Sequence, residues 1–242
     1  MPLPSPGPLL DTRFWAVGRW GHQISFIPCE SEEKAKDITS CLRRGLSRYL
    51  DRFVLGAAEG SGEWGQLVAA VLEAFASEYE HLIDPRRNVQ NIETLLRIGL
   101  GATSASTRTC LDYGCGTGLS CAVAIRMGVD VVGVDGCPRM RQEARRRGLK
   151  VASPKLLSRW RRWQCGVVFA SYVLHFPSSL DGLPIAWGRL APGGVLVGNC
   201  YKSIGSSAVT TCLLKLGGKT MTITNKSLSK RHGPVLLFRK PL

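Results

Sequence analysis

Apolar residues change their spacing near residue 100, and this change divides the chain into two regions. Before it, they recur at helical intervals, as do Ile38, Leu42 and Leu46 in "SEEKAKDITSCLRRGLSRYLDRFVLG", where Ser31 is a candidate N-cap. The stretch "EWGQLVAAVLEAFASEYEHLI" repeats this spacing, Asp84-Pro85 interrupts it, and "NVQNIETLLRIGL" resumes it. We therefore expect residues 9–100 to form a helical N-terminal segment.

From residue 101 onward, short apolar runs alternate with helical patterns. The predicted strands include "TCLDY", "VDVVGVD", "CGVVFASYVLHF" and "GGVLVGNC". Such alternation is typical of a doubly wound α/β fold with a mostly parallel sheet. The last two apolar runs, "KTMTITNKS" and "GPVLLFRKP", are joined by a polar turn and predict a hairpin, so the last strand should be antiparallel.

Composition excludes several classes of protein. Four of the first eight residues are proline, so we expect Met1–Pro8 to be a flexible tail rather than a secretory signal. No apolar run reaches the length of about 18 residues that a membrane span needs. The nine cysteines form no CxxC pair, which favours reduced thiols in a cytoplasmic protein over a disulfide framework or a metal site.

Charge is unevenly distributed between the two regions. Residues 1–100 hold 11 Lys/Arg and 13 Asp/Glu, whereas residues 101–242 hold 21 Lys/Arg and 5 Asp/Glu. The basic runs are "RMRQEARRRGLK" and "SRWRRW". A field of this sign attracts RNA or another anionic partner, although an arginine-rich solvated helix face explains it equally well.

A glycine-rich turn follows the first predicted strand in "CLDYGCGTGLS". Gly114, Gly116 and Gly118 let the chain turn sharply and let a ligand lie against bare backbone, at the positive end of the following helix. Asp135 ends the next strand, where an acid accepts hydrogen bonds from the hydroxyls of a ribose. The spacing differs from the GxGxxG of dinucleotide-binding proteins and from the P-loop. The turn therefore predicts a nucleoside site.

These motifs resemble those of the class I S-adenosylmethionine-dependent methyltransferases. "CLDYGCGTG" is similar to the first motif of that family and "VVGVDGCPRM" to the second. "VVFASYVLHFP" resembles the fourth-strand motif, and "RLAPGGVLVGN" resembles the turn before the fifth strand. The resemblance covers about 140 residues. It implies a Rossmann-like, seven-stranded sheet in residues 101–242, and S-adenosylmethionine as cofactor with S-adenosylhomocysteine as product.

The same resemblance implies a set of cofactor-binding residues. The family often carries Asp or Asn after the third strand, where this chain reads "VASPK" and offers Ser153 instead. The implied set is Asp112, Gly114, Cys115, Gly116, Gly118, Asp135, Gly136, Ser153 and Ser171.

Two residues after the fourth strand are candidates for catalysis. His175 is a candidate general base, because its pKa normally lies near neutral pH, and packing is its alternative role. Tyr172 is a candidate contact for cofactor or substrate. Tyr79 and His81 are candidate lid residues, because the N-terminal segment of such enzymes often covers the substrate pocket. His232 has no sequence context that favours chemistry.

Three functions remain open at this stage. The loop "ASYVLHFP" lacks the motifs of enzymes that methylate nucleic-acid bases, which favours a small-molecule methyltransferase acting on an O, N or C atom. The basic half favours an RNA-directed methyltransferase instead. A non-catalytic cofactor-binding or scaffold protein is the third reading. The sequence leaves the oligomeric state open.

Overall fold

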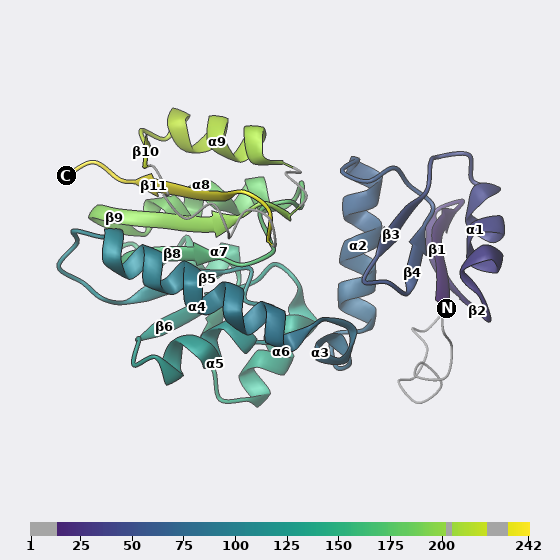
Figure 1. Cartoon of the computed structure of the whole chain (residues 1–242), viewed down its shortest axis with the longest axis horizontal. Coiled ribbons are helices and arrows are strands. Elements are labelled where there is room, and N and C mark those ends of the chain that lie inside the picture. Colours follow the sequence, from purple (N-terminus) through teal and green to yellow (C-terminus); the bar gives the residue numbers. More distant parts are fainter. Residues whose placement is uncertain (1–13, 202–204, 222–231) are drawn as a thin grey trace. The chain divides into compact units, whose positions relative to one another are not determined.

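The computed structural model describes residues 14–201, 205–221 and 232–242, so the tail expected at Met1–Pro8 lies outside the described residues. The chain divides into two compact units, Met1–Ile83 and Asp84–Leu242 (Figure 1). The boundary expected near residue 100 is therefore wrong. The helix at Pro85–Ala102 belongs to the second unit, because it packs on the sheet of that unit.

The N-terminal unit is built on a four-stranded sheet, which contradicts the expectation of a helical segment. Its strands are β1 (Phe14–Trp20), β2 (Gln23–Cys29), β3 (Ser47–Tyr49) and β4 (Phe53–Leu55), in the order β2-β1-β4-β3. Only the β1–β4 pair is parallel. The helices of this unit are α1 (Glu32–Ser40), α2 (Gly62–Ala74) and the short α3 (Tyr79–Leu82).

Both faces of this small sheet are covered. Ala16 and Val54 pack with Ala35 of α1 on one face. The neighbouring residues Trp15 and Phe53 point to the other face, where their rings contact Phe75 at the end of α2. This alternation, with a period of two residues, is the pattern of a strand buried on both sides. Accordingly, α1 and α2 lie on opposite sides of the sheet (Figure 1).

The long helix expected after Ser31 stops early. It begins as predicted, with Ser31 Oγ accepting a hydrogen bond from Lys34 N at 3.1 Å, but ends at Ser40. Gly45 (φ +86°), Leu50 (φ +49°) and Asp51 (φ +54°) then adopt left-handed backbone conformations, which a continuous helix does not allow. Of the apolar residues that fit helical spacing, Ile38 lies in α1, whereas Leu42 and Leu46 lie in the connection that follows it. Phe53 belongs to the β3–β4 hairpin.

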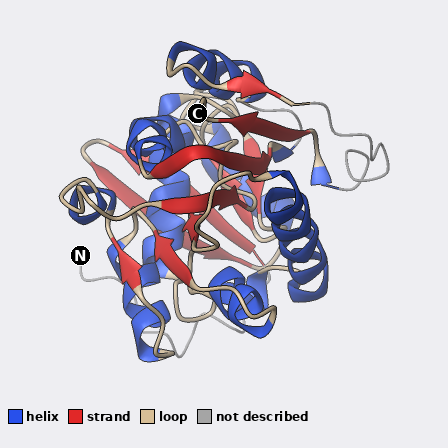
Figure 2. Cartoon of the chain, turned by 90° about the vertical axis from the view of Figure 1, so that its left-hand side faces the viewer, coloured by secondary structure: helices blue, strands red, loops and turns tan. Residues whose placement is uncertain are grey.

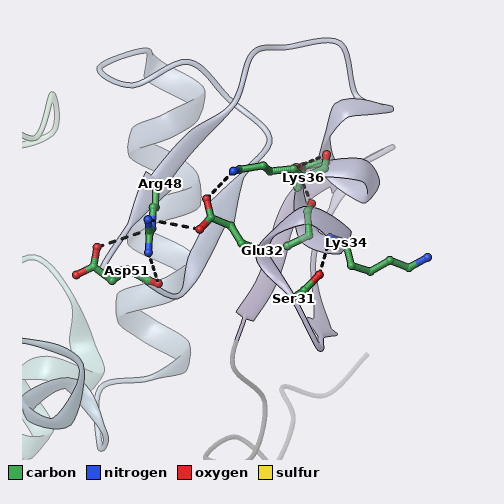
Figure 3. A network of polar contacts seen from close by, with 8 residues as sticks. Ser31, Glu32, Lys34, Lys36, Arg48 and Asp51 are labelled. Atoms are coloured by element: carbon green, nitrogen blue, oxygen red, sulfur yellow. Dashed lines mark hydrogen bonds and ion pairs between the residues drawn. The ribbon is translucent and has the colours of Figure 1, made fainter.

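An ion-pair network joins this hairpin to α1 (Figure 3). Glu32 contacts Lys36 Nζ at 2.7 Å and Arg48 at 3.4 Å, and Arg48 also contacts Asp51 at 3.8 Å. Exposed pairs of this kind contribute about 1 kcal/mol at most. The network therefore orients the hairpin more than it stabilises the unit.

The C-terminal unit has the predicted doubly wound sheet, including the antiparallel last strand. Its strands are β5 (Cys110–Tyr113), β6 (Val131–Val134), β7 (Val151–Ala152), β8 (Cys165–Ala170), β9 (Leu190–Asn199), β10 (Lys219–Thr220) and β11 (Val235–Arg239). Their order is β10-β11-β9-β8-β5-β6-β7, and β11 runs antiparallel to β9. The fold class expected for this region is thus confirmed.

Helices cover both faces of this larger sheet (Figure 2). They are α4 (Pro85–Ala102), α5 (Leu119–Arg126), α6 (Pro138–Arg146), α7 (Pro154–Leu157), α8 (Ser179–Gly188) and α9 (Ser206–Lys215). Val167 and Phe169 of β8 pack in the core with α4 and α5, whereas Val168 and Ala170 pack in the core with α7, α8 and α9. Among the described helices, none combines the length and apolar character needed to cross a membrane.

Candidate functional site

Two loops meet at the carboxyl ends of β5 and β8, which are neighbours in the sheet. From β5 the chain continues outward through β6 to β7, whereas from β8 it continues in the opposite direction to β9. Open α/β sheets bind ligands at such a switch point. One loop is the glycine-rich turn 114–118 and the other begins at Ser171, so the topology brings the predicted cofactor and substrate residues to one edge.

The glycine-rich turn has the conformation that its sequence predicts. Gly114, Gly116 and Gly118 have φ values of +82°, +54° and +96°, in the region that glycine tolerates without strain. The N–H groups of Gly114 and Cys115 donate to the carbonyl oxygen of Val134 at 2.7 and 3.1 Å, which ties the turn to β6. Gly118 then starts α5, whose free N–H groups face the turn.

Asp135 lies at the end of β6 with its carboxylate fixed by two backbone donors. Oδ2 accepts from Gly116 N at 2.9 Å and Oδ1 accepts from Cys137 N at 2.8 Å. Burial raises the pKa of Asp135, and these two N–H groups and Arg141 oppose the rise. Each carboxylate oxygen has a lone pair left for a ligand. This geometry fits an acid that accepts both hydroxyls of a ribose.

Asp112 supports the turn from behind. Its side chain is fully buried between β5 and α5, where Oδ2 accepts hydrogen bonds from Ser120 Oγ and from Cys121 Sγ. Burial raises the pKa of Asp112 to about 7, although both hydrogen bonds lower it. The carboxyl group therefore holds the first turn of α5 in place and is not exposed to a ligand on the turn.

Cys115 and Gly136 present different surfaces to a cofactor. The Cys115 thiol is buried against Cys121, so its backbone alone is available to a ligand. A Cβ atom on Gly136 would meet no atom within 4 Å, so the backbone beside Asp135 is open. Gly136 is thus placed where a ligand bound to Asp135 would pass.

The two predicted serines each accept a hydrogen bond and keep a hydroxyl hydrogen to donate. Ser153 follows β7 and caps α7, with Oγ accepting from Leu156 N at 3.1 Å. Ser171 follows β8, and its Oγ accepts from Asn91 Nδ2 at 2.9 Å. Both lie at the carboxyl edge of the sheet. Their cofactor contacts stay predictions.

Tyr172 is the most constrained residue of the second loop. Its φ of +54° is unusual for a residue with a large side chain. Asn199 Oδ1 accepts from the N–H of Tyr172 at 2.9 Å, and the phenol oxygen is hydrogen-bonded to Nδ1 of His232. Arg87, from the first turn of α4, also hydrogen-bonds the phenol. Three other segments of the chain thus converge on Tyr172: one bonds its backbone, and two bond its phenol.

A buried amide pair holds these segments together. Asn91 of α4 and Asn199 of β9 are both fully buried, and Asn91 Nδ2 donates to Asn199 Oδ1 at 3.0 Å. Asn199 Nδ2 donates to the carbonyl oxygen of His232 at 2.7 Å. Sequence reasoning missed Asn91, Asn199 and His232. The position of Asn199 at the end of a strand was the one available signal.

His175 is nearly enclosed, with 7% of its surface exposed. Its ring lies 4.0 Å from the ring of Phe176 and 5.8 Å from that of Tyr201, measured between centroids. This environment suits packing, which is the alternative role of His175. The assignment of His175 as a base stays a prediction.

The candidate lid residues both lie in the N-terminal unit. Tyr79 begins α3 and is half-buried, and His81 is exposed on the same short helix. Their role over the substrate stays a prediction.

Comparison with known proteins agrees with this geometry. Residues 111–198 match the family model of a methyltransferase domain. No curated protein matches the sequence.

Solved structures, among them two methyltransferases, share the fold. DesVI of Streptomyces venezuelae is 12% identical and aligns over 70% of this chain and 98% of its own, with a TM-score of 0.55. The N-methyltransferase NodS from Bradyrhizobium japonicum, solved with S-adenosylhomocysteine, is 20% identical over 72% and 98% of the two chains, with a TM-score of 0.53. The magnesium protoporphyrin IX methyltransferase from Synechocystis, solved with bound cofactor, is 14% identical over 73% and 96%, with a TM-score of 0.51.

The matched segment runs from β5 through the glycine-rich turn, Asp135 and the loop after β8 to the end of β9, and so contains the whole predicted cofactor site. With the motif order, the strand order and the site geometry in agreement, residues 111–198 form a methyltransferase domain, and the C-terminal unit has the fold of the S-adenosylmethionine-dependent methyltransferases.

Proposed function

We propose that this enzyme transfers the methyl group of S-adenosylmethionine to an oxygen, nitrogen or carbon atom of a small-molecule acceptor bound beside Tyr172. One observation carries the proposal: Gly114 of the cofactor turn packs directly against the side chain of Val173. Because Tyr172 precedes Val173, its polar network adjoins the place where the cofactor binds.

Different residues of the site would bind the cofactor and the acceptor. Asp135 would accept the ribose hydroxyls, and the turn 114–118 would lie against the rest of the cofactor. When bound, the cofactor supplies a methyl group that is activated by a positively charged sulfur. The protein then has to align the acceptor and exclude water, for which the rigid, buried network around Asn199 is suited.

The RNA-directed alternative depends on where the arginines lie. Arg145 Nη2 donates to the carbonyl oxygen of Val151, the first residue of β7, at 3.3 Å. Arg159, Arg161 and Arg162 are exposed in the segment just before β8. Arg145 and the run 159–162 are therefore near the amino ends of the strands, whereas the glycine-rich turn and Tyr172 are at the carboxyl ends. Arg141 is different, because its Nη1 donates to the carbonyl oxygens of Asp135 and Gly136 beside the turn. The separation of Arg145 and of the run 159–162 from the turn favours the small-molecule acceptor.

A labelled-methyl experiment tests the proposal. Purified protein is first titrated with S-adenosylmethionine and S-adenosylhomocysteine by calorimetry. It is then incubated with methyl-labelled cofactor and either a small-molecule extract or total RNA, and the label is traced by mass spectrometry. Label in a small molecule supports the proposal, and label confined to RNA contradicts it. The absence of cofactor binding would revive the scaffold reading.

A charge-reversal variant separates binding at the amino edge from catalysis. Replacing Arg145, Arg146 and Arg147 by Glu should leave small-molecule methylation unchanged. If the acceptor were RNA held by these arginines, the variant would lose methylation together with the salt dependence of RNA binding.

The nine free thiols support placing the reaction in the reducing cytoplasm.

A further inference from the structure

Tyr172 differs from every other described residue of the C-terminal unit that has a positive φ, because all the others are glycines. A large residue in this conformation persists where its surroundings hold it, and such residues concentrate at functional sites. Here Asn199 holds it, by accepting from the N–H of Tyr172. The conformation directs the phenol toward His232.

His232 is held by the same amide. Asn199 Nδ2 donates to the backbone carbonyl of His232, so one buried side chain fixes the backbones of both Tyr172 and His232. The imidazole is itself buried, with 4% of its surface exposed. Asn199 therefore aligns the phenol of Tyr172 with Nδ1 of His232, although these two residues are 60 positions apart in the sequence.

The charged and titratable groups around the phenol determine its protonation. Burial raises the pKa of Tyr172, and Tyr201 and Asp84 add to the rise, whereas the guanidinium of Arg87 opposes it. The phenol therefore keeps its proton at neutral pH. It can accept a proton from another group only if it passes its own proton on.

We propose that Tyr172 and His232 form a proton relay that deprotonates the acceptor during methyl transfer, with Tyr172 as the catalytic residue and His232 as the positioned proton sink. The inference rests on the proposed function. The acceptor O–H proton moves to the Tyr172 oxygen, and the phenolic proton moves to Nδ1 of His232. The electron pair freed on the acceptor forms the bond to the methyl carbon, and the carbon–sulfur bond breaks with its pair left on sulfur.

The relay specifies the acceptor class. A general base helps only where the acceptor has a proton to lose, and it contributes most for a neutral hydroxyl or phenol, which is a weak nucleophile until it is deprotonated. An acceptor with no proton at the reacting atom, such as pyridine, gains nothing from it. The site therefore fits a hydroxyl-bearing acceptor, and we assign Tyr172 rather than His175 as the base.

Nitrogen-15 NMR of the complex with S-adenosylhomocysteine tests the relay without an acceptor. At neutral pH, Nδ1 of His232 should resonate as an unprotonated, hydrogen-bonded nitrogen, and Tyr172→Phe should shift it. The matched control is Tyr113→Phe, which removes a buried phenol that donates to the Ser179 carbonyl and should leave the His232 signal unchanged. A protonated Nδ1, or a signal indifferent to Tyr172→Phe, overturns the relay.

Turnover on two probes gives a second measurement. With phenol as acceptor, Tyr172→Phe and His232→Gln should each lower kcat by about 100-fold, the usual contribution of a general base. Gln keeps a hydrogen-bond acceptor but cannot take the proton. With pyridine as acceptor, both variants should lose much less activity than with phenol, and equal losses on the two probes would contradict the relay. If neither probe is methylated, the NMR result decides alone.

The relay and the proposed function fail in different ways. Tyr172→Phe and His232→Gln should bind S-adenosylhomocysteine as tightly as the wild type does in calorimetry. A wild-type protein that binds no cofactor would disprove the proposed function, whatever the NMR of His232 shows in the cofactor-free protein. Normal cofactor binding with an unaltered His232 signal in Tyr172→Phe would disprove the relay alone.

Discussion

A Cβ atom placed on Gly114 would lie 2.4 Å from Cγ2 of Val173. The glycine therefore does more than permit a turn, since its missing side chain is the space into which the loop after β8 packs. The glycine-rich turn and the loop after β8 pack against each other at this contact, so a larger side chain at position 114 must displace Val173.

Gly114→Ala should consequently separate the two loops. We expect the affinity for S-adenosylmethionine to fall on the order of 100-fold, or about 3 kcal/mol, as measured by calorimetry. The matched control is Gly128→Ala at the end of α5. Gly128 has a similar φ of +75° but no atom within 4 Å of the added Cβ, so this variant should lose about 1–2 kcal/mol of stability and bind the cofactor normally. Equal binding by the two variants would contradict the role of the Gly114–Val173 contact.

Asp135→Ala should weaken cofactor binding through two effects. The ribose hydroxyls lose a charged acceptor, and the N–H groups of Gly116 and Cys137 lose the carboxylate that holds the turn. Because a hydrogen bond to a charged group contributes roughly 1.5–3 kcal/mol, we expect a loss on the order of 100-fold in calorimetric titration. The exposed Asp130, replaced by Ala, is the control. An unchanged affinity in Asp135→Ala would disprove the assignment of this residue to the ribose.

Asp112 should make the stability of the protein depend on pH. Its pKa is about 7 in the folded state, whereas the ordinary value is 3.8, so the folded protein keeps this proton over a range in which the unfolded chain loses it. The free energy of unfolding should therefore fall as the pH rises from about 4 to about 7, and the contribution of Asp112 should be constant above that range. Asp112→Asn should flatten this part of the curve in urea denaturation. Asp130→Asn should retain it, and a curve unaffected by Asp112→Asn would contradict the raised pKa.

Asn199→Ala should damage both stability and the acceptor side of the site. The variant removes one hydrogen-bond partner each from Tyr172 N, Asn91 Nδ2 and the His232 carbonyl, all in the interior. Leaving buried polar groups without a partner costs about 1–3 kcal/mol each, so thermal unfolding should occur at a clearly lower temperature. The control is Asn88→Ala, one turn before Asn91 on α4. This variant removes a single hydrogen bond to the Asp84 carbonyl and should have a small effect. Similar losses in both variants would mean that the network is not specific.

The sequence was sufficient for the C-terminal sheet and for the cofactor turn. There, the local pattern and the tertiary structure agree: apolar runs form buried strands, and the three glycines of the turn stand where the backbone needs a positive φ. The N-terminal unit was mispredicted because Leu50 and Phe53 fit helical spacing as well as they fit a hairpin. The decisive information, the left-handed backbone at Leu50 and Asp51, is not visible in a pattern of apolar residues.

The acceptor side was only partly predictable for a different reason. Tyr172 and His175 lie next to a recognisable strand, but His232 becomes relevant only when β11 pairs with β9. Hydrogen bonds such as that between Asn91 and Asn199 join residues 108 positions apart. Spacing along the chain contains no signal for contacts of this range. The small-molecule acceptor and the lid role of Tyr79 and His81 stay predictions.

The position of α4 also has a consequence for how the protein is made. This helix leaves the ribosome before any strand of its sheet, yet it packs on β8 and β9, and Arg239 of the last strand donates to the carbonyl of Ala102 at its end, 137 residues later. Contacts of such long range slow folding. During synthesis the apolar face of α4 therefore stays uncovered until most of the remaining chain has been made. In this interval the nascent enzyme is most exposed to aggregation and to capture by chaperones.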